Sequence, residues 1–231
     1  MIRGIKTPKE IEKIKKACAL SDKIFPEILK SIKIGITEKE LASKITRLIR
    51  SKNGKLSFRP IVAFGKNASE VHHKPSNLKL RKNHGFIMMD FGAKVDGYCS
   101  DITRTVFFGN ASQRQKKVYN TVLEAQRRSI KFAKTNCKAF NVDRISREYI
   151  IEQKFSNIPH SVGHGIGKKI HEFPRISPKS KTILRNGMAF TIEPGVYIKN
   201  FGGVRIEDTF CLMTGKLYQL TKSPKNLLEL V

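Results

Sequence analysis

Acidic residues are scarce in this sequence of 231 residues. It contains 19 Asp and Glu against 45 Lys and Arg, which gives a formal net charge of +26 at pH 7. An unpaired carboxylate buried in a protein core destabilises the fold by several kcal/mol. An acid that interrupts an apolar strand therefore needs a cation, a network of hydrogen bonds or a raised pKa, and each such acid is informative.

The basic residues form no tail and no motif in which aromatic and basic residues alternate. They are spread along the whole chain, which favours a generally basic, solvated surface. A charge of this size also suits binding to nucleic acid or to a ribosome. A nucleic-acid partner therefore stays open as an alternative but is not favoured.

Long hydrophobic runs and paired cysteines are missing as well. No apolar run is long enough to span a bilayer, and the segment MIRGIKTPKEIEKIKK lacks the apolar core of a secretory signal. The four cysteines are widely spaced, form no CxxC pair and are interpreted as reduced thiols. These absences predict a cytoplasmic protein that does not associate with membranes.

Helices and strands are predicted to alternate in two blocks. Apolar residues at helical spacing predict a helix over 8–33, kinked or split at Pro26, and a second helix that begins with the capping box at Thr37. Short apolar runs punctuated by Gly and Asp predict an antiparallel meander over 58–110.

The second block repeats this order. Ser112 and Asn141 are predicted to cap two further helices, and strands follow, one of them over 204–212. The two blocks predict an α+β domain with two pseudo-symmetric halves, in which helices cover a curved antiparallel sheet. Because no linker or break in composition divides the chain, we expect a single domain over 1–231.

Each block places two acids in or near apolar strands. Asp90 ends FIMMD and is followed by Asp101, and Glu193 ends MAFTIE and is followed by Glu207. A strand pair of that length can bring its two acids to one face. Taken singly, the first two acids also suit turn capping, and Glu207 also suits an ion pair with Arg205. The interpretation that all of these acids have only such structural roles is the less favoured one.

Three of the six histidines lie in IPHSVGHGIGKKIHEFP, and one of them, His164, is flanked by Gly163 and Gly165. Glycines there allow the backbone to pass close to whatever the imidazole contacts. Four convergent carboxylates repel one another unless cations lie between them. Carboxylates with one imidazole suit Mn²⁺, Fe²⁺, Co²⁺ or catalytic Zn²⁺, and five ligands are more than one ion needs. The pattern predicts a two-metal hydrolase and leaves the substrate open.

Four motifs extend this prediction. MDFGAKVDGYCSDITRT, HSVGHGIGKKIHEFPRIS, GMAFTIEPGVYI and GGVRIED, in this order, resemble motifs of the Xaa-Pro peptidases, aminopeptidase P and prolidase. These enzymes belong to the wider methionine aminopeptidase superfamily. The resemblance covers nearly the whole chain and implies the pita-bread (creatinase/aminopeptidase) fold.

The resemblance also implies roles for individual residues. It implies two divalent ions, most often Mn²⁺ with Co²⁺, Zn²⁺ or Fe²⁺ as alternatives. Asp101 and Glu207 are expected to bridge the ions, and the full set of implied ligands is Asp90, Asp101, His164, Glu193 and Glu207. A metal-bridging hydroxide is expected to attack the scissile carbonyl while Glu193 carries the proton to the leaving amine.

Four further residues match motif positions around the substrate. His72 and His171 are expected to bind the substrate and to stabilise the tetrahedral intermediate. His160 and Arg205 are expected to bind the substrate or to support the groups that do. With Glu193, the first two form the implied catalytic set.

The implied function is a dinuclear metal-dependent exopeptidase that removes the N-terminal residue from peptides with proline in second position. Xaa-Pro peptidases usually carry a separate N-terminal domain, and we expect none here, so that 1–231 is a single metallopeptidase catalytic domain. That length suits a methionine aminopeptidase, which is the first alternative. A non-catalytic binding module of the same fold is the second. The expected partners are peptides, and the expected assembly is a monomer or homodimer.

Overall fold

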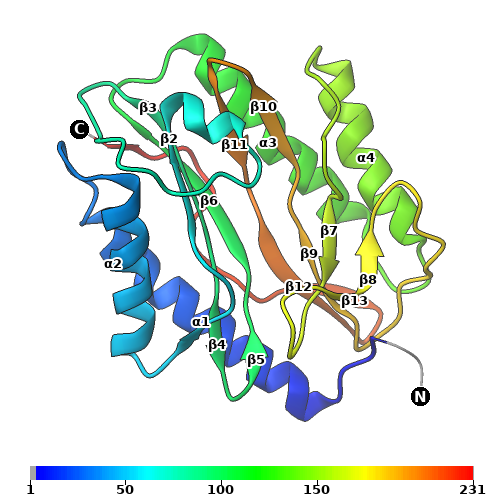
Figure 1. The fold of residues 1–231 in the computed structure, drawn as a ribbon. Coiled ribbons are helices and arrows are strands. Elements are labelled where there is room, and N and C mark those ends of the chain that lie inside the picture. Colours follow the sequence, from blue (N-terminus) through cyan, green and yellow to red (C-terminus); the bar gives the residue numbers. More distant parts are fainter. Residues whose placement is uncertain (1–3, 231) are drawn as a thin grey trace.

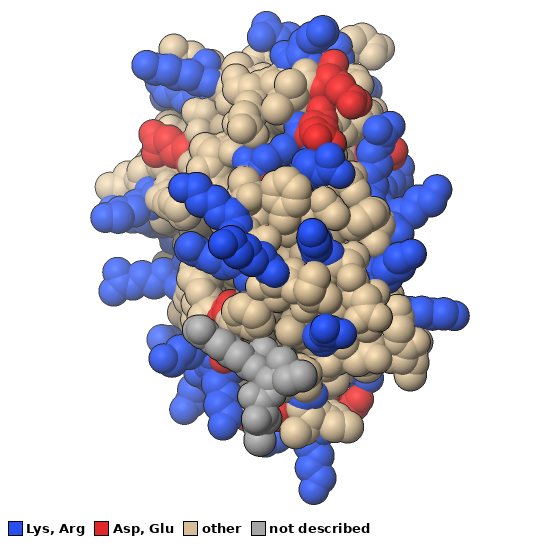
Figure 2. All heavy atoms as spheres, turned by 90° about the vertical axis from the view of Figure 1, so that its right-hand side faces the viewer, with Lys and Arg blue, Asp and Glu red and all other residues tan. Residues whose placement is uncertain are grey.

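The computed structural model describes residues 4–230, and its helices and strands form two halves that lie side by side (Figure 1). Each half consists of two helices followed by a group of strands, as the alternation of helical and strand patterns predicts. Lysine and arginine side chains are spread over the face shown in Figure 2 and do not gather in a single patch. Within the described residues, no helix combines the length and apolar character needed to cross a membrane.

The first half opens with α1 (Pro8–Leu29) and α2 (Glu38–Ser51). Thr37 accepts a hydrogen bond from the backbone of Glu40, whose side chain accepts one in return, so the predicted capping box is confirmed. Pro26 lies inside α1, which continues to Leu29, so the helix is not split. A proline so near the C-terminal end removes little from the helical hydrogen bonding.

The first main sheet has the strand order β14-β6-β3-β2. Its strands are β2 (Ile61–Phe64), β3 (Gly85–Phe91), β6 (Ile102–Phe108) and β14 (Glu229–Leu230). The pairs β2–β3 and β3–β6 are antiparallel as predicted, whereas β14 pairs with β6 in parallel. Three short strands form a separate small sheet: β1 (Lys55–Leu56), β4 (Ala93–Val95) and β5 (Tyr98–Cys99). The 3₁₀ helix η1 (Gly65–Ser69) follows β2.

The second half begins with α3 (Gln113–Phe132) and α4 (Ala139–Glu152). Its main sheet has the order β13-β12-β9-β7-β8. These strands are β7 (Gly163–Gly165), β8 (Glu172–Ile176), β9 (Ala189–Ile192), β12 (Asp208–Met213) and β13 (Lys216–Gln219). A separate hairpin consists of β10 (Gly195–Ile198) and β11 (Gly202–Arg205).

Two local predictions in the second half are wrong. Asn141 lies inside α4, which begins after Lys138 without a side-chain cap. The start of α4 is held by tertiary contacts, since the Ala139 amide donates to the Thr182 carbonyl. The strand predicted over 204–212 is divided into β11 and β12, and the break between them contains Glu207.

The strand β3 is buried on both faces, which explains its nearly continuous apolar sequence. Ile87 and Met89 belong to the core cluster formed with α1 and α2, whereas Phe86 and Met88 belong to the cluster formed with α3 and the second sheet. Side chains alternate along a strand, so Asp90 has the same orientation as Phe86 and Met88. The acid that ends β3 therefore faces the second half of the molecule.

Candidate metal centre

Corresponding strand ends deliver two acids from each half. Asp90 lies in β3, and Asp101 immediately precedes β6, its antiparallel partner. Glu193 immediately follows β9, and Glu207 immediately precedes β12, its antiparallel partner, in a register that pairs Ile192 with Asp208. Antiparallel pairing places the end of one strand beside the start of the next, so each half contributes a neighbouring pair of carboxylates.

Hydrogen bonds between the halves bring the two pairs together. The Thr103 hydroxyl donates to Glu207 Oε2 over 2.6 Å, and the Glu207 amide donates to the Thr103 carbonyl over 3.1 Å. Two residues after Glu207, the Thr209 hydroxyl donates to the Asp101 carbonyl over 2.8 Å. Residues more than 100 positions apart are thus joined along a seam between β6 and the segment around Glu207.

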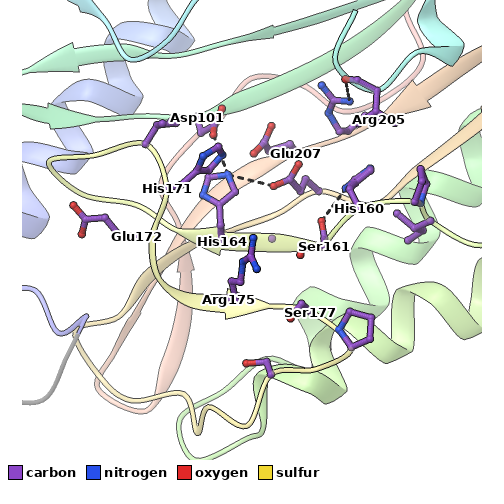
Figure 3. A pocket seen from close by; sticks show the side chains of 18 of the residues that line it. Asp101, His160, Ser161, His164, His171, Glu172, Arg175, Ser177, Arg205 and Glu207 are labelled. Carbon is purple, nitrogen blue, oxygen red and sulfur yellow. Dashed lines mark hydrogen bonds and ion pairs between the residues drawn. The ribbon is translucent and has the colours of Figure 1, made fainter.

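His164 completes the cluster from β7 (Figure 3). Its Nε2 atom lies 3.3 Å from Asp101 Oδ2 and 3.4 Å from Glu193 Oε1. Ligand atoms of Asp101, His164 and Glu207 all lie within 4.8 Å of one another. The acids and the histidine predicted from the sequence are therefore brought together in space, with Asp90 close by beside Arg205.

The geometry of the His164 ring suits a metal ligand. Its Nδ1 atom lies 3.1 Å from the Gly165 carbonyl, which can only accept, so Nδ1 carries a proton. A neutral ring then presents the Nε2 lone pair to two carboxylate oxygens, and a cation between these atoms satisfies all of them. The flanking glycines allow a close approach between strands: a Cβ atom at Gly163 would lie 2.0 Å from the Thr191 carbonyl oxygen.

Unpartnered oxygens show that the carboxylate cluster fits a cation. Asp90 Oδ1, Asp101 Oδ1 and Glu207 Oε1 are buried and have no hydrogen-bond partner among residues 4–230. Buried polar atoms nearly always have partners, and a buried charge is paired or coordinates a metal. The donor set of hard oxygens and one imidazole nitrogen suits a first-row divalent ion. The residues present therefore fit the predicted metal site.

Burial and mutual repulsion act together on these acids. Burial raises the pKa of Asp101 well above its usual range, and the charges of Asp90 and Glu193 raise it further. Burial also raises the pKa of Glu207 strongly, with added repulsion from Asp101 and Glu193. The pKa values of Asp90 and Glu193 are raised for the same first reason. Cations at this place would remove the repulsion.

A chain of hydrogen bonds runs from Asp90 along one side of the cluster. Arg205 donates to Asp90 Oδ2 over 2.7 Å and to the Tyr197 hydroxyl over 2.9 Å, and that hydroxyl lies 2.8 Å from His160 Nε2. The His160 Nδ1 atom faces the Ser161 carbonyl, so Nε2 accepts from Tyr197. Burial, assisted by the charge of Arg205, lowers the pKa of His160 to about 3, which keeps the ring neutral. Arg205 therefore pairs with Asp90 and does not pair with Glu207.

His72 and His171 line the cavity above the acids. The His171 ring meets the His164 ring edge to face, with centroids 4.3 Å apart (Figure 3). Burial, with the neighbouring His164, lowers the pKa of His171. The cavity has a volume of about 1220 Å³ and reaches from the acids to an outer wall that carries Arg175, Lys179 and Lys181.

Sequence reasoning missed three groups that hold the site. Tyr197 links Arg205 to His160, and its only sequence signal is a hydroxyl in the otherwise apolar strand GVYI. Arg147 of α4 pairs with buried Asp143 and donates to the carbonyls of Ile158 and His160, so it fixes the segment before β7. Glu38 of α2 binds the loop that carries His72, and the capping pattern around it gave no sign of that contact.

Comparison with known proteins places this arrangement in a family. Residues 12–213 match metallopeptidase family M24, and this region contains all of the predicted site residues. The Xaa-Pro dipeptidase of Pyrococcus furiosus is 40% identical over 229 residues, which cover 98% of this chain and 66% of that protein. The chain thus spans slightly less than two thirds of the length of this relative.

Solved structures agree with the sequence match. A dipeptidase from Pyrococcus horikoshii OT3 has a TM-score of 0.94 at 43% identity. The match covers 98% of this chain and 64% of the dipeptidase chain. The X-Pro aminopeptidase from Thermotoga maritima MSB8 has a TM-score of 0.95 at 37% identity, with coverages of 98% and 65%. The predicted α+β pita-bread fold and the resemblance to Xaa-Pro peptidases are confirmed. This chain belongs to metallopeptidase family M24.

Proposed function

We propose that the chain is the catalytic unit of a metal-dependent exopeptidase that removes the N-terminal residue from peptides with proline in second position. One observation carries the proposal: four acids from two halves converge beside His164, with three buried oxygens that no described protein group satisfies. Two relatives, an Xaa-Pro dipeptidase and an X-Pro aminopeptidase, support the substrate class.

We propose two divalent ions, with Mn²⁺ as the first candidate and Co²⁺, Zn²⁺ and Fe²⁺ as alternatives. The proposed ligands are Asp90, Asp101, His164, Glu193 and Glu207. By the family resemblance, Asp101 and Glu207 would be the two acids that both ions share. They come from opposite sides of the seam between the halves, and their ligand atoms and that of His164 lie within 4.8 Å of one another, so these residues could hold a common cation. When bound, such ions acidify a water molecule and polarise the scissile carbonyl.

Glu193 is the proposed proton carrier. Burial raises its pKa, while the nearby His164 and Arg205 counteract part of that rise, so the carboxyl can accept and release a proton closer to neutral pH. The Thr191 hydroxyl donates to Glu193 Oε1 over 3.0 Å and limits the rotation of the carboxyl group. The proton would pass from the attacking water to the leaving amine.

The cavity histidines are the proposed substrate-binding groups. His72 and His171 both line the cavity and can donate to the oxygen that becomes negative as the carbonyl is attacked. His160 is fixed as a neutral ring by Tyr197 and Ser161, and Arg205 holds Asp90 in place. We therefore propose substrate contacts for His160 and an orienting role for Arg205.

The outer wall of the cavity suits an anionic group of the peptide. Arg175, Lys179 and Lys181 form no ion pair within residues 4–230, and the volume of about 1220 Å³ leaves room beyond a dipeptide. Both Xaa-Pro dipeptides and longer peptides with Xaa-Pro at the start are therefore included in the proposed substrate class.

The test is a cleavage assay on protein that has been stripped of metal and then reloaded separately with Mn²⁺, Co²⁺, Zn²⁺ or Fe²⁺. Xaa-Pro dipeptides, Xaa-Pro-Xaa tripeptides and Met-Ala-Ser are supplied in parallel. We expect metal-dependent release of the residue that precedes proline. The variant Glu40→Gln, which changes an exposed helix cap, is the matched control and should cleave like the wild type.

Two outcomes would overturn the proposal. Release of methionine alone would assign the site to a methionine aminopeptidase. An absence of hydrolysis with every metal, together with salt-dependent binding to RNA or DNA, would assign the chain to a binding module.

A further inference from the structure

The segment that carries His72 is held by contacts on both sides of that residue. On one side, Arg205 donates to the Val71 carbonyl over 3.4 Å, which connects the segment to the acid cluster. On the other side, the His73 ring and Ser76 are bound to Glu38 of α2. The His72 ring itself has no hydrogen bond within the described residues, so its position on the cavity wall depends on the backbone that these contacts fix.

Glu38 is a fully buried acid, with an exposed fraction of 0%. Its Oε1 atom accepts from the Phe64 amide over 2.8 Å and from Asn67 Nδ2 over 2.9 Å. Its Oε2 atom lies 2.8 Å from His73 Nε2 and accepts from the amide and hydroxyl of Ser76 over 2.8 and 2.6 Å. One carboxylate thus connects α2, the end of β2, η1 and the segment around His72.

His73 is bound to a carboxylate oxygen at each ring nitrogen. Nε2 faces Glu38, and Nδ1 lies 2.7 Å from Glu70 Oε2. Ionised carboxylates only accept hydrogen bonds, so both contacts are made at once only by the protonated ring, which has two donors. Glu38 and Glu70 are the charged groups that face His73, and His84 lies close enough to Glu38 for their charges to interact.

We propose that Glu38 and His73, assisted by Glu70, are positioning residues that hold His72 at the cavity wall in the orientation needed for catalysis. The catalytic part of this inference rests on the proposed function. A reacting group displaced by about 1 Å can lower the rate by about 10²-fold. Because the His72 ring makes no hydrogen bond within the described residues, the contacts that hold its backbone are expected to have a large effect on the rate.

The protonation of the two groups agrees with this arrangement. Burial opposes the charged form of Glu38, but hydrogen bonds from Ser76, His73 and Phe64 outweigh it and lower the pKa. Burial likewise opposes the charged form of His73, but hydrogen bonds to Glu70 and Glu38 outweigh it and raise the pKa. The clamp formed by Glu38, His73 and Glu70 is therefore complete between the ordinary carboxyl pKa of about 4.3 and the ordinary histidine pKa of about 6.5, and it is lost as pH rises through the raised pKa of His73.

The first experiment measures amide hydrogen exchange across residues 70–76 in the metal-loaded protein without substrate. Wild type is compared with Glu38→Gln, His73→Leu and the control Glu40→Gln, an exposed acid of the same helix turn. We expect exchange in this segment to rise by about tenfold or more in the first two variants, with α3 and the control unchanged. Exchange that stays unchanged in both variants would overturn the inference, whatever the protein cleaves.

The second measurement separates positioning from general stability. For a cleaved Xaa-Pro peptide we expect kcat/KM to fall by about 10- to 100-fold in Glu38→Gln and His73→Leu, with metal content equal to wild type. Glu70 is exposed, so Glu70→Gln should fold normally and lower kcat/KM by about 2- to 5-fold. Increased exchange with full activity would show that the clamp does not position His72 for catalysis.

A pH titration supplies a test without any substitution, should Glu38→Gln fail to fold. After correction for intrinsic exchange rates, protection of residues 70–76 should fall as pH rises through the pKa of His73, which is raised above the ordinary value of about 6.5, while α3 keeps its protection. Protection that is independent of pH up to 9, about 2.5 units above the ordinary histidine pKa, would exclude the protonated His73 clamp.

Discussion

Two sets of buried carboxylates in this chain have opposite surroundings. Glu38 accepts five hydrogen bonds from protein groups, and they lower its pKa although the side chain is fully buried. Asp101 and Glu207 are 4% and 1% exposed, each has an oxygen without a partner within residues 4–230, and burial raises both pKa values strongly. Protein groups therefore satisfy the carboxylate of Glu38, whereas Asp101 and Glu207 each keep an oxygen that a bound cation could satisfy.

The contrast is sharpest between neighbours in the sequence. Asp208 is as buried as Glu207, yet it pairs with Arg104 over 2.7 Å and with Lys225 over 3.0 Å, and Gln126 donates to it. Glu207 accepts a side-chain hydrogen bond from Thr103 alone among the described residues. Because this strongly basic chain supplies cations to Asp208 and none to Glu207, the incomplete pairing of the site acids is specific to their position.

The largest expected effect comes from neutralising one acid of the metal cluster. Asp101→Asn keeps the size of the side chain and removes a proposed bridging ligand, so metal affinity and activity should fall together. The loss of several kcal/mol of charge stabilisation predicts that kcat/KM decreases by at least about 10³-fold. Metal content by elemental analysis and peptide cleavage measure the two effects.

The matched control for that substitution is Asp208→Asn. Asp208 follows Glu207 in the sequence, but its carboxylate is already paired with basic side chains of the protein. It should lower stability, because Arg104 and Lys225 lose their charged partner, and still leave bound metal in the folded fraction. If Asp101→Asn retained both metal and activity, the proposed difference between the two kinds of carboxylate would be wrong.

A second prediction concerns how stability changes with pH in metal-free protein. The raised pKa values of Asp101 and Glu207 mean that the folded state binds more protons than the unfolded chain, so these groups lower the free energy of unfolding as pH rises above about 4. Glu38 acts in the opposite sense: its contribution is present above the ordinary carboxyl pKa and is lost as pH falls through the lowered value.

The comparison variant is Asp101→Asn combined with Glu207→Gln, measured by urea unfolding without metal. It should be more stable than the metal-free wild type at pH 7 by on the order of 1–3 kcal/mol, and the difference should shrink towards pH 4. An equal difference at both pH values would show that repulsion among the acids does not weaken the metal-free fold.

The smallest expected effect belongs to Tyr197→Phe, which tests the hydrogen-bonded residues beside the acid cluster. The substitution removes the acceptor for Arg205 and the donor for His160 while the ring stays in place. The loss of about 1–2 kcal/mol of hydrogen bonding predicts a fall in kcat/KM of about tenfold, with unchanged metal content. A fall as large as that of Asp101→Asn would mean that Tyr197 belongs to the metal cluster in function.

The sequence singles out Asp90 and Glu193 because each lies at the end of an apolar strand, whereas Asp101 and Glu207 were proposed from their spacing after those two acids and from the family resemblance. Asp90 after FIMM and Glu193 after MAFTI are incompatible with an ordinary core, so their presence there indicates a site. The order of helices and strands followed from the same periodicity. The pattern predicted that Asp101, His164 and Glu207 would lie close together. The physical cause is strand pairing within each half, together with the hydrogen bonds of Thr103 and Thr209 that join the halves at the seam.

Other features could not be predicted because tertiary contacts decide them. Glu38 and Glu40 both lie in the first turn of α2, and nothing in TEKE shows that one caps the helix while the other turns inward to His73. The start of α4 depends on the Thr182 carbonyl, more than 40 residues away in the sequence. The hydroxyl of Tyr197 in the apolar strand GVYI does not reveal its partners, because His160 and Arg205 come from separate segments.

The seam between β6 and the segment around Glu207 has a consequence for the order of folding. Thr103 and Glu207 are 104 residues apart, so a long loop must close before their bond forms, and contacts of this kind form slowly. Neither half contains all five proposed ligands, so the proposed metal site would be complete only after the two halves have docked. Metal uptake by refolding protein would report the final association of the halves and not the earlier formation of either sheet.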